Sequence, residues 1–154
     1  DYYWPKRVVE AVEMYQLAGL VGNKRRVARQ PSWAYVDDSL TYDSPDNLSG
    51  IMAHGSFFPP SNINFYGRSC QQAKLLDGLM LISKSITFHD NAFRFDEQFD
   101  FHFYDLDICR QAECKNVSMG TWPIAVIHDS ASRGAYQSIE WKRNYEKYIQ
   151  KWNN

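Results

Sequence analysis

Cysteine is scarce in this 154-residue chain, and long apolar runs are absent. The cysteines form no Cys-x-x-Cys pair and no spacing typical of a zinc site; they are Cys70, Cys109 and Cys114. An odd, sparse set indicates a reducing compartment, so we expect a cytoplasmic protein. No apolar run approaches the ~20 residues that span a bilayer, and no signal peptide is visible. The sequence therefore predicts no transmembrane segment, and peripheral contact with the inner membrane stays open.

An excess of charge is also missing, because 17 basic and 18 acidic residues leave a net charge of −1. Nucleic-acid-binding domains usually carry a basic patch, so we expect no nucleic-acid partner. The one basic cluster is short, and we interpret it as a solvated loop rather than a phosphate site; it comprises Lys24, Arg25, Arg26 and Arg29. The motifs GxSxG, GxGxxG and HExxH are absent, which leaves nucleophilic triads, dinucleotide binding and standard zinc hydrolysis without support.

Aromatic residues, in contrast, make up 16% of the chain. Such rings fill cores and also line carbohydrate sites, where apolar sugar faces stack on them, and composition does not separate these uses. The length fits one domain of ordinary size. Because the chain begins with Asp1 rather than Met, we expect one domain over residues 1–154 that is incomplete at its N-terminus.

The first half predicts a helix, a short strand and a long loop. Residues 5–18 have helical apolar spacing, with Pro5 as a first helical residue and Gly19 as a stop. Residues 20–22 follow as a short buried strand, which is half of the βαβ pattern of a mixed or parallel sheet. Residues 43–72 are rich in Pro, Gly, Ser and Asn, so we expect a long surface loop with no more than one short strand.

The second half predicts two buried strands, at 74–83 and 124–127, and two helices, at 104–112 and 138–152. Residues 93–97 look like a turn. Ser138 is a plausible N-cap of the last helix. That helix carries an aromatic stripe at helical spacing, formed by Trp141, Tyr145, Tyr148 and Trp152.

Asp77 and Gly78 interrupt the apolar strand predicted at 74–83. An ionised carboxylate there is costly unless it is paired, hydrogen-bonded or placed at the mouth of the strand. Glycine removes a side chain where a ligand or another backbone approaches closely. A bulge with a carboxylate that caps a nearby loop explains the pair equally well.

Three other residues have side chains suited to catalysis or metal binding: Asp105, Asp107 and His128. Two carboxylates two positions apart point in different directions on a helix, so one can face a cleft while the other contacts the scaffold. Spacing alone favours the simpler interpretation, in which both stabilise the start of the helix. His128 follows an apolar strand, at the end where open α/β sheets place ligands, and neutral imidazole binds divalent metals. A hydrogen-bonded histidine at a strand edge is the alternative.

Five segments in order resemble the family 2-like inverting glycosyltransferases of bacteria, which have the GT-A type of α/β fold. They are LDGLMLI at 76–82, FDEQF at 95–99, FHFYDLDIC at 101–109, GTWP at 120–123 and VIH at 126–128. Each segment is weak alone, and the ordered series is specific. The stretch from Asp1 through Trp4-Pro5 to residues 19–22 is similar to the part of the family that follows its metal-binding acidic motif.

The resemblance implies transfer of a sugar, with inversion, from a nucleotide-sugar donor to a hydroxyl of a glycan, lipid-linked or protein acceptor. It implies Asp105 as the general base, with Tyr104 where the family more often has Glu. It implies that His128 and Asp1 hold a divalent metal, Mn or Mg, or the diphosphate. The acceptor- or sugar-binding residues that it implies are Asp77, Gly78, Tyr104, Asp107 and Trp122.

The resemblance also implies a partial GT-A mixed sheet flanked by helices, without most of the nucleotide-binding half, so we expect weak donor binding by this chain alone. The side chains of Asp105 and His128 should open into one cleft beside the bend at 77–78. Two other classes stay open. One is a non-catalytic carbohydrate-binding or interaction module, and the other is a metal-dependent hydrolase that uses Asp105, Asp107 and His128.

Overall fold

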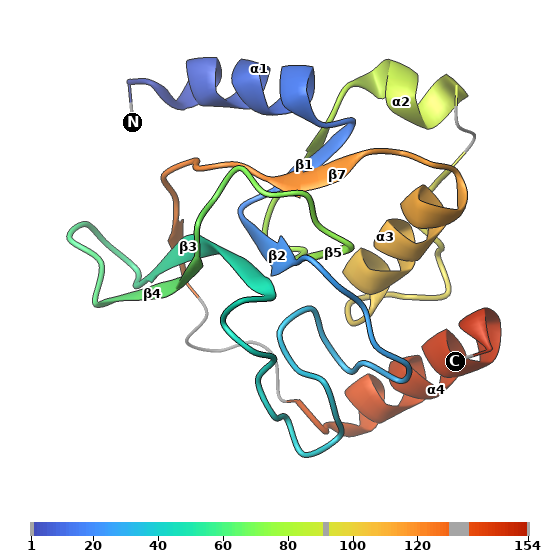
Figure 1. The fold of residues 1–154 in the computed structure, drawn as a ribbon. Coiled ribbons are helices and arrows are strands. Elements are labelled where there is room, and N and C mark those ends of the chain that lie inside the picture. The colour runs from blue at the N-terminus through green and yellow to red at the C-terminus, as the bar shows by residue number, and fades with distance from the viewer. Residues whose placement is uncertain (1, 91–92, 130–135, 154) are drawn as a thin grey trace.

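The computed structural model describes residues 2–90, 93–129 and 136–153, and these form four helices and two β-sheets in a mixed α/β arrangement (Figure 1). The smaller sheet has β1 (Leu17–Gly19) between antiparallel β6 (Leu81–Ser83) and parallel β7 (Met119–Thr121). Figure 1 shows α1 (Trp4–Met14) and α2 (Ser85–Asp90) on the same side of the sheets. The predicted mixed α/β class is therefore confirmed, although the strands form two sheets instead of the expected one.

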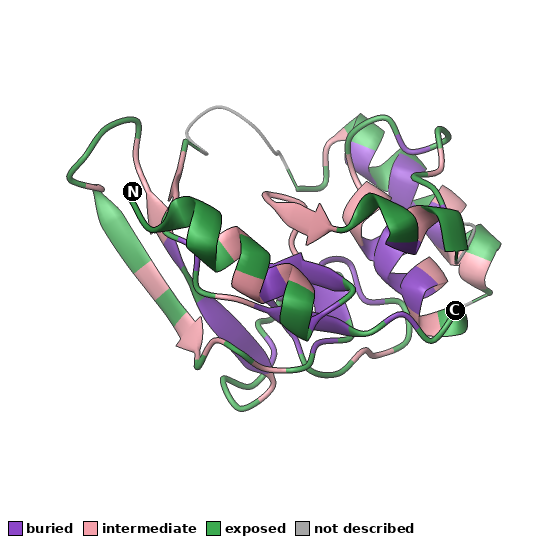
Figure 2. Cartoon of the chain, turned by 90° about the horizontal axis from the view of Figure 1, so that it is seen from above, coloured by how far each residue is buried: buried purple, intermediate pink, exposed green. Residues whose placement is uncertain are grey.

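The larger sheet has the strand order β4-β3-β2-β5, with β8 parallel to β3. Its strands are β2 (Val21–Asn23), β3 (Leu48–His54), β4 (Asn62–Gly67), β5 (Leu75–Leu76) and β8 (Ile127–His128). In Figure 2 the buried strands lie at the centre, whereas β4 lies at one edge and has both exposed and half-buried residues.

The first helix is confirmed, although it ends at Met14 and the chain then forms β1. The predicted strand at 20–22 overlaps β2. The long loop expected at 43–72 is wrong, because this stretch contains β3 and β4, the longest strands among the described residues. The strands were missed because glycine is uncommon in strands and this stretch contains several. Gly50 has φ +101° in β3, and a Cβ there would lie 2.2 Å from the Leu20 carbonyl oxygen.

The strand predicted at 74–83 is divided, because a turn at Asp77 separates β5 from β6 and carries the chain from one sheet to the other. The Leu79 amide donates to the Asp77 carboxylate over 2.7 Å and closes this turn. The strand predicted at 124–127 is largely wrong, since residues 122–126 are irregular around Pro123 and only Ile127 belongs to β8. Pro123 lacks the amide hydrogen that a strand ladder uses.

The last two helices are confirmed. Helix α3 (Tyr104–Cys114) packs against β5, and α4 (Ile139–Trp152) begins at Ser138, whose hydroxyl accepts from the Trp141 amide over 3.1 Å. Three rings of the predicted stripe surround Phe103 at 5.3–5.5 Å between centroids; they belong to Trp141, Tyr145 and Tyr148. The stripe therefore fixes the segment that enters α3.

Within the described residues, no helix has the length and apolar character needed to cross a lipid bilayer.

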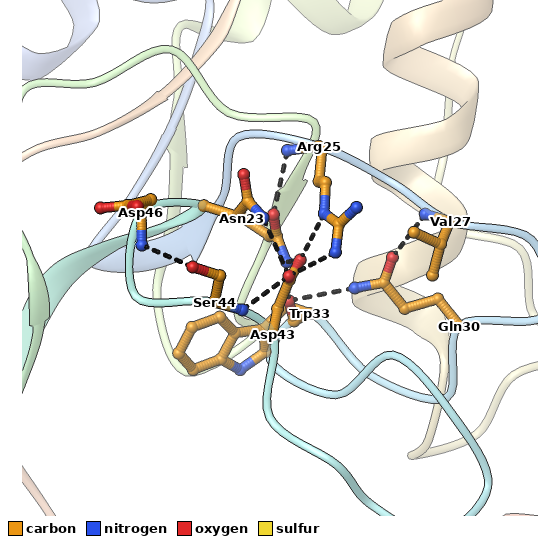
Figure 3. A network of polar contacts seen from close by, with 9 residues as sticks. Asn23, Arg25, Val27, Gln30, Trp33, Asp43, Ser44 and Asp46 are labelled. Carbon is orange, nitrogen blue, oxygen red and sulfur yellow. Dashed lines mark hydrogen bonds and ion pairs between the residues drawn. The ribbon is translucent and has the colours of Figure 1, made fainter.

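The basic cluster was interpreted as a solvated loop; its Lys24, Arg25 and Arg29 are exposed, but two of its arginines also pair with carboxylates of the scaffold. Arg25 pairs with buried Asp43, and Arg26 pairs with Glu113. Asp43 also accepts from the Asn23 side chain over 2.9 Å (Figure 3). The Arg25 guanidinium holds the pKa of the Asp43 carboxyl well below its usual range. These ion pairs leave Arg25 and Arg26 committed to internal partners rather than to a phosphate.

Candidate active site

One cavity of about 490 Å³ collects most of the residues singled out in the sequence. It is lined by Asp77 and Gly78 after β5, Tyr104 and Asp105 at the start of α3, and His128 at the end of β8. The expected common cleft of Asp105 and His128, beside the 77–78 bend, is therefore present.

Asp105 is held against the turn that follows β5. Phe103 precedes α3 in a left-handed conformation (φ 69°), and Asp105 lies in the first turn of that helix. One carboxylate oxygen accepts from the Gly78 amide over 3.1 Å, and the other accepts from the Leu106 amide over 2.9 Å. Two backbone donors from different elements thus orient the group, as a reacting carboxylate requires.

The environment raises the pKa of Asp105 to about 7. The largest cause is the loss of water around the carboxylate, and the second is the negative charge of Asp77. The two backbone N–H bonds act in the opposite direction. Desolvation therefore outweighs the stabilisation that a helix N-terminus offers an anion. A carboxylate with a pKa near neutrality is a stronger general base than an exposed aspartate.

Asp77 is a hydrogen-bonded carboxylate at the mouth of β5. It accepts from the Trp33 indole N–H and from the Leu79 amide. Burial raises its pKa above the ordinary value. The carboxylate therefore caps the loop after β5, as one of the two sequence interpretations had it, and it also lines the cavity and contributes to the raised pKa of Asp105.

The sequence analysis did not identify Trp33 as a site residue, because no motif surrounds it and only its aromatic character distinguishes it. Its carbonyl accepts from the Asn23 side chain over 3.0 Å and from the Gln30 side chain over 3.2 Å (Figure 3). Its indole then donates to Asp77 inside the cavity. Trp33 therefore connects the hydrogen-bond network of Figure 3 to Asp77 in the cavity.

Gly78 and Tyr104 pack directly on each other. A Cβ on Gly78 would lie 2.3 Å from the Tyr104 hydroxyl oxygen, and that hydroxyl donates to the Gly78 carbonyl over 3.0 Å. Burial raises the pKa of Tyr104 to about 12, so the phenol stays neutral. The close approach expected at Gly78 is therefore made by a side chain of the protein, which braces the turn beside Asp105.

His128 lies opposite a second imidazole that the sequence did not reveal. Parallel pairing of β3 with β8 puts His54 and His128 in register, with ring centroids 5.7 Å apart, and both line the cavity. His54 was missed because it falls in the stretch interpreted as a loop. Nδ1 of His128 is buried without a hydrogen-bond partner in the part of the chain that the structure describes.

The described residues contain no group of three or more His, Cys, Asp or Glu side chains arranged to hold a metal ion. Asp1, the other metal ligand implied by the resemblance, lies outside the described residues. The imidazole of His128, with its unpaired nitrogen, nevertheless fits the role of one ligand, because buried polar nitrogens are normally bonded.

Two expected site residues do not reach the cavity. Asp107 is fully buried in the scaffold, where it accepts from Gln111 over 2.7 Å and from Trp152 over 2.8 Å. Two positions of helix separate it from Asp105, so the two carboxylates face different directions. The Trp122 amide donates to Gly19 of β1, and its ring packs against the core instead of lining the cavity.

The remaining walls of the cavity are strongly aromatic. Eight further Phe, Tyr and Trp rings line it: Trp33, Tyr35, Tyr42, Tyr66, Phe101, Phe103, Tyr136 and Trp141. Flat rings next to a few oriented polar groups are typical of small-molecule sites, including those for sugars.

Comparisons of the chain with protein-family models, with curated protein sequences and with solved structures find no match.

Proposed function

We propose that this chain is the acceptor side of a GT-A type glycosyltransferase, which moves a sugar from a nucleotide-sugar to a hydroxyl acceptor with inversion. The observation that carries the proposal is Asp105, an oriented carboxylate with a pKa of about 7 in an aromatic cavity. The ordered sequence segments are its second support. The proposal extends to a cytoplasmic enzyme that acts on a glycan, a lipid-linked sugar or a protein.

The reaction needs one proton acceptor. The hydroxyl of the acceptor loses its proton to the Asp105 carboxylate while its oxygen bonds to the anomeric carbon of the donor sugar. The bond from that carbon to the diphosphate breaks on the opposite face, and the nucleotide diphosphate leaves with the electron pair. The hydrogen bond from Gly78 fixes the direction of the base, and the rings orient the sugar.

A divalent metal, Mn or Mg, would supply positive charge to the leaving diphosphate when bound. In the proposal His128 is the imidazole that holds it, and Asp1 is the carboxylate that the resemblance adds. Asp105 keeps its role as base.

The test is a donor and acceptor screen with the longest natural polypeptide that carries residues 1–154. Nucleotide-sugars, Mn²⁺ and a panel of hydroxyl acceptors are supplied, and both the nucleotide diphosphate and the glycosylated product are measured. Equal amounts of the two products with inverted anomeric configuration support the proposal. Free sugar instead of a transferred product indicates the hydrolase, and glycan binding with no turnover indicates a binding module.

A further inference from the structure

The hairpin of β3 and β4 ends in an exposed apolar tip. Figure 1 shows the two strands and their connection projecting away from the body of the molecule. Phe57 and Phe58 follow each other in the connection and are 82% and 87% exposed. Two adjacent phenyl rings in water are costly unless another phase covers them.

One face of the same hairpin continues the apolar surface. Cross-strand register places Ile51 opposite Phe65 and Ala53 opposite Ile63, so these side chains share a face. Ile51, Ile63 and Phe65 are all exposed. The opposite face carries Met52, which is buried and lines the cavity. The hairpin therefore has an inner face that packs on the protein and an outer face whose apolar side chains are exposed.

Formal charge is absent from the whole hairpin. From residue 47 to residue 67 the sequence contains no Asp, Glu, Lys or Arg, and its polar residues are Ser, Asn, Tyr and one His. Exposed edge strands such as β4 normally carry charges that prevent pairing with other strands. The polar rim of a protein interface usually carries charged groups that orient the partner, and residues 47–67 supply none.

We infer that this hairpin docks on a phospholipid bilayer, with Phe57 and Phe58 inserted between the headgroups. A narrow, convex and uncharged tip fits a deformable lipid surface better than it fits a preformed protein groove. The neutral Ser and Asn side chains beside the rings suit the headgroup layer, where amphipathic surface elements bind. The inference rests on the hairpin surface and not on the proposed sugar transfer.

The experiment is flotation of the purified chain with vesicles of phosphatidylcholine alone, at about 0.15 M and about 0.5 M NaCl. The chain should bind these neutral vesicles at both salt concentrations, because insertion of uncharged rings is not screened by salt. The double variant Phe57→Ser/Phe58→Ser should lower the vesicle partition coefficient by about tenfold or more. Both residues are almost fully exposed, so circular dichroism and melting temperature should not change.

A matched control removes two exposed apolar side chains elsewhere, as Ile86→Ser/Ile139→Ser, and should bind vesicles as the parent does. Equal binding by the tip variant and the parent would overturn the inference. Absence of binding to neutral vesicles, or its loss at the higher salt, would do the same. A dimer that forms without lipid and dissociates in the tip variant would assign the hairpin to a second copy of the chain instead.

Discussion

The carboxylate of Asp105 combines properties that normally exclude each other. It sits in the first turn of a helix and accepts two backbone hydrogen bonds, yet its pKa is about 7. The loss of water and the charge of Asp77 together exceed those stabilising contacts. A base of this kind is fully ionised only above neutral pH.

Replacement of Asp105 by Asn should therefore lower kcat by about 10²–10⁴-fold under the proposed function, because an amide cannot accept the proton of the acceptor. Under the same proposal, the parent protein should show activity that rises with pH through about 7, as the base loses its proton. Steady-state kinetics over pH 5–9 measure both effects. Turnover within about tenfold of the parent would exclude Asp105 as the base.

Asp77→Asn removes one of the two causes that raise the pKa of Asp105. The acid limb of the pH–rate profile should move to lower pH, because the neutral amide no longer disfavours the ionised base. Asp100→Asn is the control, since Asp100 is outside the cavity and pairs with Arg143. An unchanged acid limb in Asp77→Asn would show that the charge of Asp77 does not raise the pKa of Asp105.

At the scale of helices and strands, the sequence predicted the elements that have clear local patterns and missed those that depend on pairing with distant residues. Helices α3 and α4 were predicted because carboxylates, a serine cap and helical spacing of apolar residues coincide at their starts. The β3–β4 hairpin was missed because Gly and Asn break the usual strand composition, although pairing supplies its stability. His54 was missed with it, since strand register alone brings it to His128.

Helix α4 offers a direct test of such a local signal. Ser138→Ala removes the hydroxyl that accepts from the Trp141 amide, and it should lower the free energy of unfolding by about 1 kcal/mol. Chemical denaturation measures the change. Ser56→Ala at the exposed hairpin tip is the control and should change stability by less than about 0.5 kcal/mol. Equal effects of the two substitutions would contradict the capping role.

At the scale of the whole molecule, the sequence predicted the mixed α/β class and the shared cavity, and it did not predict how the sheets divide. The reason is the turn at Asp77, which sends one apolar run into two sheets. Trp33 escaped notice for a similar reason, because only the folded chain brings the Asn23 network to the cavity. Long-range placement of this kind has no local pattern in the sequence.

Asp105 also makes the stability of the whole fold depend on pH. Its folded pKa is about 7 against an ordinary value of 3.8, so between these pH values the folded state keeps a proton that the unfolded state releases. Stability from this group is present below about pH 4 and is lost as pH rises to about 7. Asp105→Asn should thus gain stability relative to the parent as pH rises over that range, by up to about 4 kcal/mol.

Thermal or chemical unfolding of the parent and Asp105→Asn at pH 4, 6 and 8 measures this difference without substrate. A constant difference over the three pH values would mean that Asp105 titrates normally in the folded protein. The test is therefore independent of the reaction assigned to the site.

The two faces of strand β3 have different surroundings. Met52 and His54 line the cavity, while Ile51, which precedes Met52, is exposed on the outer face of the hairpin. If the hairpin docks as inferred, the same strand holds the cavity close to the lipid surface. Acceptors tethered in that surface would then reach the cavity by lateral diffusion in two dimensions, and freely dissolved ones would compete at a disadvantage.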